Sequence, residues 1–119
     1  MDSAPKTDLE KKVRSFFSPG GVLSKKLPGY EPRFSQALMA HAVLRVIEED
    51  GILIVEAATG TGKTLAYLVP SLAAGKRVVV STGTKNLQEQ LFFKDVPFLK
   101  ELGGKFKAAV MKGRGNYLC

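Results

Sequence analysis

Cysteine, histidine and long apolar runs are all scarce in this chain of 119 residues. A single cysteine, Cys119, cannot form an internal disulfide, and a single histidine, His41, leaves no Cys/His cluster that could hold zinc or an iron-sulfur centre. No apolar run approaches the roughly 20 residues that a membrane-spanning helix needs, and the first residues are polar where a secretory signal would be apolar. We therefore expect no membrane partner and a cytoplasmic location.

The composition is that of an ordinary globular protein, but its charge is uneven along the chain. Hydrophobic residues make up 45% and charged residues 24%, so the chain can bury the core of one domain or of part of one. The net charge is +7, of which residues 71–119 carry +6, with nine basic and three acidic side chains. This balance fits either a polyanionic partner or a solvated, solubilising surface, and composition alone does not choose between them.

Apolar spacing and capping residues predict four helices. After the first, a Ser-Pro-Gly-Gly run predicts a stop and then a loop as far as Tyr30. Gly51 and Gly75 are expected to end the second and third helices. Thr84 is expected to cap the fourth, and Pro97 to interrupt it. The four expected helices cover residues 8–17, 33–50, 63–74 and 84–93.

Three short aliphatic runs predict strands of the buried kind. They occupy residues 52–55, 77–81 and 106–111, and the first two alternate with the predicted helices. Strands that alternate with helices are typical of a parallel sheet joined by right-handed crossovers. The sequence therefore predicts an α/β fold.

A glycine-rich turn lies between the first predicted strand and the helix that follows it. Its glycines let the backbone aim several N–H groups at a phosphate, which also lies at a helix N-terminus. The lysine would reach the β- and γ-phosphates, and the following threonine hydroxyl would bind Mg²⁺. Alanine replaces the usual first glycine, and a purely structural turn is the alternative interpretation. The candidate nucleotide-binding residues here are Ala57, Thr59, Gly60, Thr61, Gly62, Lys63 and Thr64.

Three segments form a recognisable set: EAATGTGKTLAY at residues 56–67, STGTKNLQEQL at 81–91 and KGRGNYLC at 112–119. Together they resemble the DinG family of superfamily 2 DNA helicases, which are relatives of XPD. The resemblance covers nearly the whole chain from Tyr30 onward. It implies a P-loop NTPase of the RecA-like type, a parallel sheet with flanking helices that is incomplete in this chain, with ATP and Mg²⁺ as cofactors.

The same resemblance assigns roles upstream and downstream of the glycine-rich turn. In the family a glutamine recognises adenine, and Gln36 in the segment YEPRFSQ holds that position, since a carboxamide can both donate to and accept from the base. A solvent-facing glutamine is the alternative. Thr82, Gly83 and Thr84 match the motif that grips single-stranded DNA through its phosphates, whereas helix capping by Thr84 alone needs no ligand.

Two features of the family are incomplete or absent in this sequence. In DinG-like helicases the cysteine at the position of Cys119 is the first of four iron-sulfur ligands, and the chain has no other thiolate, so a cluster is expected only in the complete family member. The acidic strand motif that binds Mg²⁺ and activates water is also absent, as is a second domain with arginine fingers. We therefore expect a C-terminal helicase portion outside these residues.

The sequence as a whole predicts the ATP-binding portion of an ATP-dependent DNA helicase, acting in DNA repair or replication. Residues 1–29 are expected to form an N-terminal helix and loop, and residues 30–119 the N-terminal part of the ATP-binding domain. As an enzyme the complete family member hydrolyses ATP, and this chain alone is expected to be inactive. The alternatives are a truncated, catalytically inactive nucleotide- or nucleic-acid-binding fragment and a small P-loop phosphotransferase.

Overall fold

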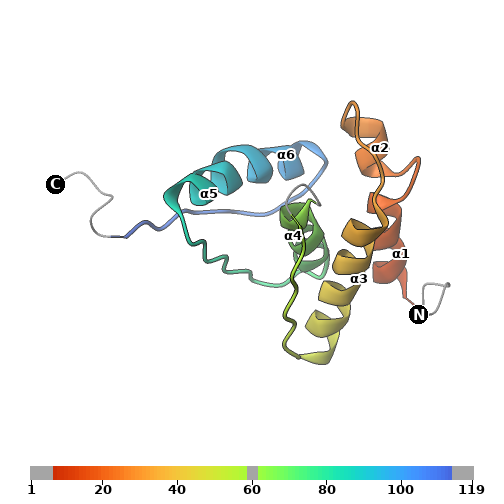
Figure 1. Ribbon diagram of the computed structural model, residues 1–119, viewed down its shortest axis with the longest axis horizontal. Coiled ribbons are helices and arrows are strands. Elements are labelled where there is room, and N and C mark those ends of the chain that lie inside the picture. Colours follow the sequence, from red (N-terminus) through yellow and green to blue (C-terminus); the bar gives the residue numbers. More distant parts are fainter. Residues whose placement is uncertain (1–6, 59–61, 114–119) are drawn as a thin grey trace. The chain divides into compact units, whose positions relative to one another are not determined.

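A computed structural model describes residues 7–58 and 62–113, and all of its regular structure in these ranges is helical. The chain divides into two compact units, Met1–Val79 and Val80–Cys119, which we describe one at a time. The first unit holds α1, α2, α3 and α4, and the second holds α5, the π-helical turn η1 and α6 (Figure 1).

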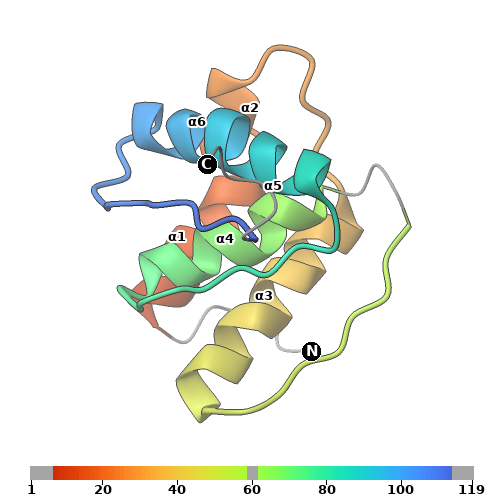
Figure 2. The same ribbon diagram turned by 90° about the vertical axis from the view of Figure 1, so that its left-hand side faces the viewer.

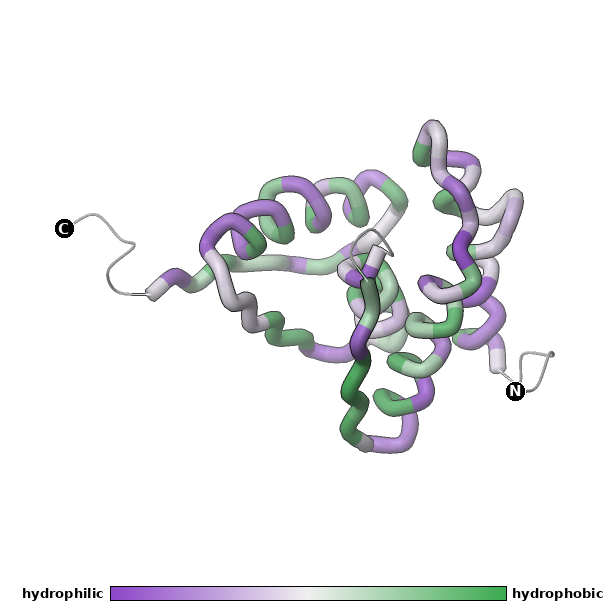
Figure 3. The backbone as a smooth tube through the Cα atoms, in the orientation of Figure 1, coloured by the Kyte–Doolittle hydropathy of each residue, from purple (hydrophilic) through white to green (hydrophobic). Residues whose placement is uncertain are grey.

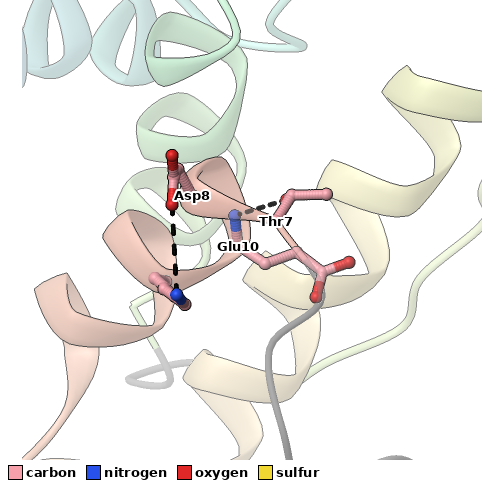
Figure 4. A network of polar contacts seen from close by, with 4 residues as sticks. Thr7, Asp8 and Glu10 are labelled. Atoms are coloured by element: carbon pink, nitrogen blue, oxygen red, sulfur yellow. Dashed lines mark hydrogen bonds and ion pairs between the residues drawn. The ribbon is translucent and has the colours of Figure 1, made fainter.

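The first helix, α1 (Asp8–Phe17), coincides with the helix that the sequence predicts. The Thr7 hydroxyl caps it by accepting a hydrogen bond from the backbone N–H of Glu10 at 3.1 Å (Figure 4). Asp8 lies in the first turn, where a negative charge is favoured by the helix dipole. Val13 and Phe17 are buried on the other side of the helix. The helix is thus secured by its cap at one end and by apolar burial along one face.

The expected loop up to Tyr30 contains a short helix that the sequence did not predict, α2 (Val22–Lys26). The Pro-Gly-Gly stop is confirmed, since α1 ends at Phe17, but the chain turns helical again at once. Tertiary burial explains this: Leu23 is completely buried, and α2 contacts α1. The turn requires glycine at position 21, because a Cβ there would collide with the backbone oxygen of Ser15.

The centre of the first unit is the packing of α3 (Phe34–Glu49) against α4 (Lys63–Ala73), with α1 in contact with both (Figures 1 and 2). Ala40, Leu44 and Ala66 are completely buried there. Two alanines in the buried core let the helix backbones approach closely, while the leucine fills the remaining space. Both helices match the sequence expectation to within a residue at either end.

The ends of α3 and α4 differ in which residue turns the chain. Asp50, rather than the expected Gly51, takes the left-handed conformation after α3, with φ 53°, and the Gly51 N–H donates to the Val46 oxygen at 3.0 Å. Asp is one of the few non-glycine residues that tolerate this conformation. After α4 the prediction holds, because Gly75 has φ 70° and its N–H donates to the Leu72 oxygen.

The three predicted strands are extended segments without strand pairing anywhere in the described part of the chain. In the first of them Ile52 and Ile54 are 92% and 91% exposed, whereas Leu53 and Val55 are 37% and 41% exposed, so the burial expected of this run is not observed. Figure 3 shows the segment as an apolar stretch between α3 and α4. A β-strand is hydrogen-bonded to a neighbouring strand, and in the described residues these segments make no such strand-to-strand bonds. The parallel sheet is therefore not seen in this structure.

The second unit is built on one continuous helical run, α5 (Lys85–Gln90), η1 (Leu91–Asp95) and α6 (Val96–Glu101). Pro97 was expected to interrupt the helix after Phe93, but the run continues to Glu101. The π turn just before the proline explains the difference, because the Val96 N–H donates to the Leu91 oxygen five residues back. This widened turn accommodates a residue that has no N–H of its own.

Side-chain contacts hold the extended segment after α6 to this helical run. The Gln88 amide donates to the Met111 backbone oxygen at 2.8 Å, and the Lys100 ammonium lies 5.5 Å from the centre of the Phe106 ring. Leu99 is the buried apolar residue of α6. Among the helices of the described ranges, none is long and apolar enough to cross a membrane.

Candidate nucleotide-binding and nucleic-acid-binding sites

The described part of the glycine-rich turn opens directly into α4. Gly62 is the N-cap residue, in the left-handed conformation with φ 78° and ψ 40°, and Lys63 and Thr64 are the first two helical residues. No side chain caps this end of the helix, so its first backbone N–H groups have no side-chain acceptor. Such N–H groups, at the positive end of the helix dipole, favour an anion. Three predicted site residues, Thr59, Gly60 and Thr61, lie outside the described residues.

The Lys63 side chain reaches back across the turn. Its ammonium donates to the backbone oxygen of Ala57 at 2.8 Å, so the two ends of the turn are joined by a hydrogen bond. Lys63 is exposed, and an ammonium has three donor hydrogens, of which this bond uses one. The Thr64 side chain is partly exposed beside it. The two predicted catalytic residues thus lie together at one end of α4.

Gln36 joins the predicted adenine-recognition segment to the same turn. Its amide nitrogen donates to the Gly62 backbone oxygen at 3.1 Å, and its amide oxygen accepts from the Tyr30 hydroxyl at 2.7 Å. The residue is only 4% exposed, so the solvent-facing alternative is wrong. Burial raises the pKa of the Tyr30 phenol above its usual value, and the charge of Arg33 lowers it in part. The phenol therefore keeps its proton, and its donor role, well above neutral pH.

Gly62 is constrained both by its backbone conformation and by the space around it. A Cβ at this position would collide with the Gln36 amide nitrogen. Its positive φ also disfavours any side chain. The turn and the glutamine are therefore fitted to one another, and a glycine is needed where they meet.

In the second unit, Thr82 and Thr84 use their hydroxyls differently. The Thr82 hydroxyl donates to the Thr84 backbone oxygen at 3.1 Å, so its hydrogen is already used. The Thr84 hydroxyl accepts from the Leu87 N–H at 3.2 Å, which confirms the predicted cap and leaves its own hydrogen to donate elsewhere. A Cβ on Gly83 would meet nothing within 4 Å. Of the two hydroxyls, that of Thr84 is the one with a hydrogen left to donate.

The predicted iron-sulfur ligand, Cys119, lies outside the described residues. Within residues 7–58 and 62–113, no three His, Cys, Asp or Glu side chains gather closely enough to hold a metal ion.

These features place a lysine at the start of a helix, after a glycine-rich turn, with a buried glutamine bonded to that turn. A lysine at the start of a helix after a glycine-rich turn is the sequence pattern typical of P-loop nucleotide-binding proteins. The sequence matches the family model of the DEAD/DEAH box helicases over residues 36–116, which is most of its length. The chain therefore belongs to the DEAD/DEAH box helicase family, whose domain has a P-loop, RecA-like fold.

Three curated relatives show which helicases the chain resembles. The chain is 49% identical over 113 residues to the ATP-dependent DNA helicase YoaA of Haemophilus influenzae, covering 94% of this chain and 18% of the relative. It is 52% identical over 104 residues to YoaA of Escherichia coli, covering 87% of this chain and 16% of that protein. It is 40% identical over 104 residues to the ATP-dependent DNA helicase DinG of E. coli, with coverages of 82% and 14%. No solved structure matches the chain significantly.

The chain spans less than a fifth of the length of these relatives. The matches confirm the predicted resemblance to DinG-like helicases. They concern the N-terminal part of much longer proteins.

Tyr30 is the site residue to which sequence reasoning gave no role. It occurs in the quoted segment YEPRFSQ, but a tyrosine six residues before a glutamine has no chemical signature of its own. Only the fold brings its hydroxyl to the Gln36 amide, since the chain turns from coil into α3 between the two residues.

Replacing Gly62 with alanine should destabilise the first unit more than the same change at Gly75. Both residues have a positive φ, at 78° and 70°, so both changes incur the left-handed penalty of about 1–2 kcal/mol. Only at position 62 does the new methyl group also collide with Gln36, whereas at position 75 it meets nothing within 4 Å. Urea unfolding of Gly62→Ala and Gly75→Ala measures the difference, and equal losses of unfolding free energy would contradict the close fit.

Proposed function

We propose that this chain is the ATP-binding portion of an ATP-dependent DNA helicase. The observation that carries the proposal is the hydrogen bond between the buried Gln36 amide and Gly62, the residue that immediately precedes Lys63. It joins the predicted base-recognition and phosphate-binding residues into one site. Membership of the DEAD/DEAH box helicase family and the printed names of the relatives support the same activity.

In the proposed site the nucleotide phosphates lie against the turn from Ala57 to Thr64. Backbone N–H groups of the turn, with those of Thr59, Gly60, Thr61 and Gly62 among them, donate to the β-phosphate. Lys63 exchanges the Ala57 oxygen for phosphate oxygens, which carry charge and make the stronger hydrogen bond. The adenine edge is held by the Gln36 carboxamide.

The ligand that we propose for Mg²⁺ is the Thr64 hydroxyl oxygen. A hydroxyl oxygen beside nucleotide phosphates is the kind of hard ligand that Mg²⁺ binds, so the residue fits the ion. When bound, the ion neutralises charge on the phosphate oxygens. A four-thiolate iron-sulfur cluster does not fit these residues, because Cys119 is the chain's one cysteine, and the other ligands would have to come from elsewhere in a complete family member.

The proposal retains the parallel sheet of the family's fold. Residues 52–55, 77–81 and 106–111 already run extended, and in a complete domain they would pair as adjacent strands with the helices on their faces. Residues 1–29 precede this ATP-binding portion, 30–119, in the sequence. In space α1 packs against α3 and α4, so the preceding segment helps to support the site.

Single-stranded DNA is the proposed polyanionic partner. The Thr84 hydroxyl has a hydrogen to donate, Gly83 leaves its backbone open to a phosphate, and Thr82 fixes the local turn. Residues 71–119 also carry a charge of +6, which favours any nucleic acid backbone. We propose a role in DNA repair or replication in the cytoplasm, with a C-terminal helicase portion as the further partner.

Removing the Lys63 ammonium should weaken Mg-ATP binding about ten- to a hundredfold. The change deletes a charge-assisted contact worth roughly 1.5–3 kcal/mol. Calorimetry of the chain and of Lys63→Ala measures the effect. Lys76→Ala removes the same charge from an exposed residue just beyond α4 and should bind as the unchanged chain does. Equal Mg-ATP affinity in Lys63→Ala would refute the assignment.

Binding of single-stranded oligonucleotides, such as an oligothymidylate, should be weak, insensitive to their sequence and steeply dependent on salt. For single strands the log-log slope is about −0.7 per phosphate neutralised, so a handful of contacts gives a slope of about −2 to −4. Lys85→Ala, next to Thr84, should reduce the magnitude of the slope by about 0.7, whereas Lys25→Ala in α2 should leave it unchanged. Fluorescence anisotropy between low and moderate salt tests this, and an affinity independent of salt counts against the DNA proposal.

The 119 residues alone should release no phosphate from ATP above background, even with DNA present. The sequence holds no acidic strand motif to bind Mg²⁺ and activate water, and an arginine finger alone contributes about 10³–10⁵ in rate. A phosphate-release assay on the purified chain decides between the alternatives. Robust turnover that disappears in Lys63→Ala would overturn this expectation and favour the small P-loop phosphotransferase over both the helicase portion and an inactive binding fragment.

A further inference from the structure

The Gln36 carboxamide has half of its hydrogen-bonding capacity taken up by two protein contacts. Its oxygen has two lone pairs and accepts one hydrogen bond, from the Tyr30 hydroxyl at 2.7 Å. Its nitrogen has two hydrogens and donates one of them, to the Gly62 backbone oxygen at 3.1 Å. One lone pair and one hydrogen therefore remain on the same planar group.

The two partners together fix which way round this amide lies. If the amide rotated by 180°, its oxygen would face the Gly62 carbonyl oxygen, and two acceptors would oppose each other without a proton between them. The Tyr30 hydroxyl would at the same time lose the acceptor to which it donates. Each loss would leave a polar atom at this largely buried residue, which is 4% exposed, without its present partner.

A fixed amide distinguishes the two purines at their Hoogsteen edges. Adenine presents an acceptor at N7 and a donor at its 6-amino group, which match the remaining hydrogen and lone pair of Gln36. Guanine presents acceptors at both N7 and O6, so the remaining lone pair would meet another acceptor. An amide free to rotate would discriminate less, since it could adjust to either edge.

We propose that Tyr30 is a specificity-determining positioning residue, whose hydroxyl holds the Gln36 amide in the orientation that accepts adenine and rejects guanine. The inference rests on the nucleotide site proposed above and adds to it the residue that sets its base selectivity. Tyr30 acts through Gln36, by a hydrogen bond to the amide oxygen, and makes no contact with phosphate in this scheme. Burial of the phenol keeps the donor protonated across the range of pH in which nucleotides are bound.

The test compares three ligands on the full chain: Mg-ATP, Mg-GTP and Mg-tripolyphosphate, which has no base. The unchanged chain should bind ATP more tightly than GTP. In Tyr30→Phe, which retains the ring and removes the hydroxyl, the ratio of ATP to GTP affinity should fall about three- to tenfold, the range expected for one neutral hydrogen bond. Tripolyphosphate affinity should stay the same, because the phosphate-binding turn is untouched.

Two further variants serve as controls. Ser35→Ala removes an exposed hydroxyl adjacent to Gln36 in the sequence and should change none of the three affinities. Tyr30→Leu deletes the same hydroxyl with a different apolar side chain and should give the same fall in selectivity, so a folding defect peculiar to the phenylalanine variant cannot decide the outcome. Thermal melting monitored by circular dichroism reports whether each variant is folded.

Different binding results would overturn the selectivity inference and the proposed nucleotide site. An unchanged ATP to GTP ratio in both Tyr30 variants overturns the positioning role, and so does an equal loss for all three ligands, which would mark Tyr30 as structural only. Equal binding of ATP and GTP by the unchanged chain overturns the selectivity inference and leaves the phosphate site standing. If the unchanged chain binds neither ATP nor tripolyphosphate, the nucleotide site itself is wrong and the inference falls with it.

Discussion

The close packing of α3 against α4 is the constraint on which the candidate site depends. Ala40 and Ala66, both completely buried, leave room for the two helices to approach, and the approach puts the first turn of α3 beside the N-cap of α4. At that point the Gln36 amide meets the Gly62 oxygen. A larger side chain at either alanine would separate the helices and part these two groups, so the chemistry of the site depends on packing about one helical turn away from it.

Most of the helices could be predicted from the sequence because their signals are local. Thr7 and Thr84 cap their helices through contacts three residues along the chain, and Gly75 turns the chain at the end of α4. α2 could not be predicted, since it depends on the burial of Leu23 and on the contact with α1, which local propensity does not describe. Pro97 did not end the helix because a π turn precedes it. Residue propensities do not describe the hydrogen bonds to the fifth residue back that form such a turn. The three runs predicted as strands are non-helical but unpaired, because pairing requires a neighbour, which a propensity cannot supply.

For the candidate site, the sequence identified the residue types and the fold supplied their connections. Lys63 and Thr64 could be read from glycine spacing at a predicted helix start, and the structure places them there. Gln36 depended on a resemblance, because 26 residues separate it from Gly62 and no local rule joins them. The role of Tyr30 and the hydrogen bond from the Thr82 hydroxyl to the Thr84 backbone oxygen could not be read at all, since they follow from which atom donates to which.

The hydrogen bond between Lys63 and the Ala57 oxygen bears on which groups could displace it from the turn. In the free chain one of the three ammonium hydrogens is bonded to a neutral carbonyl, so an uncharged acceptor would replace that bond with one of similar strength. An anionic oxygen would replace it with a stronger one, because a charge-assisted hydrogen bond is about twice as strong as a neutral one. An anionic group at the turn would therefore compete with the Ala57 oxygen for the lysine more effectively than an uncharged group would.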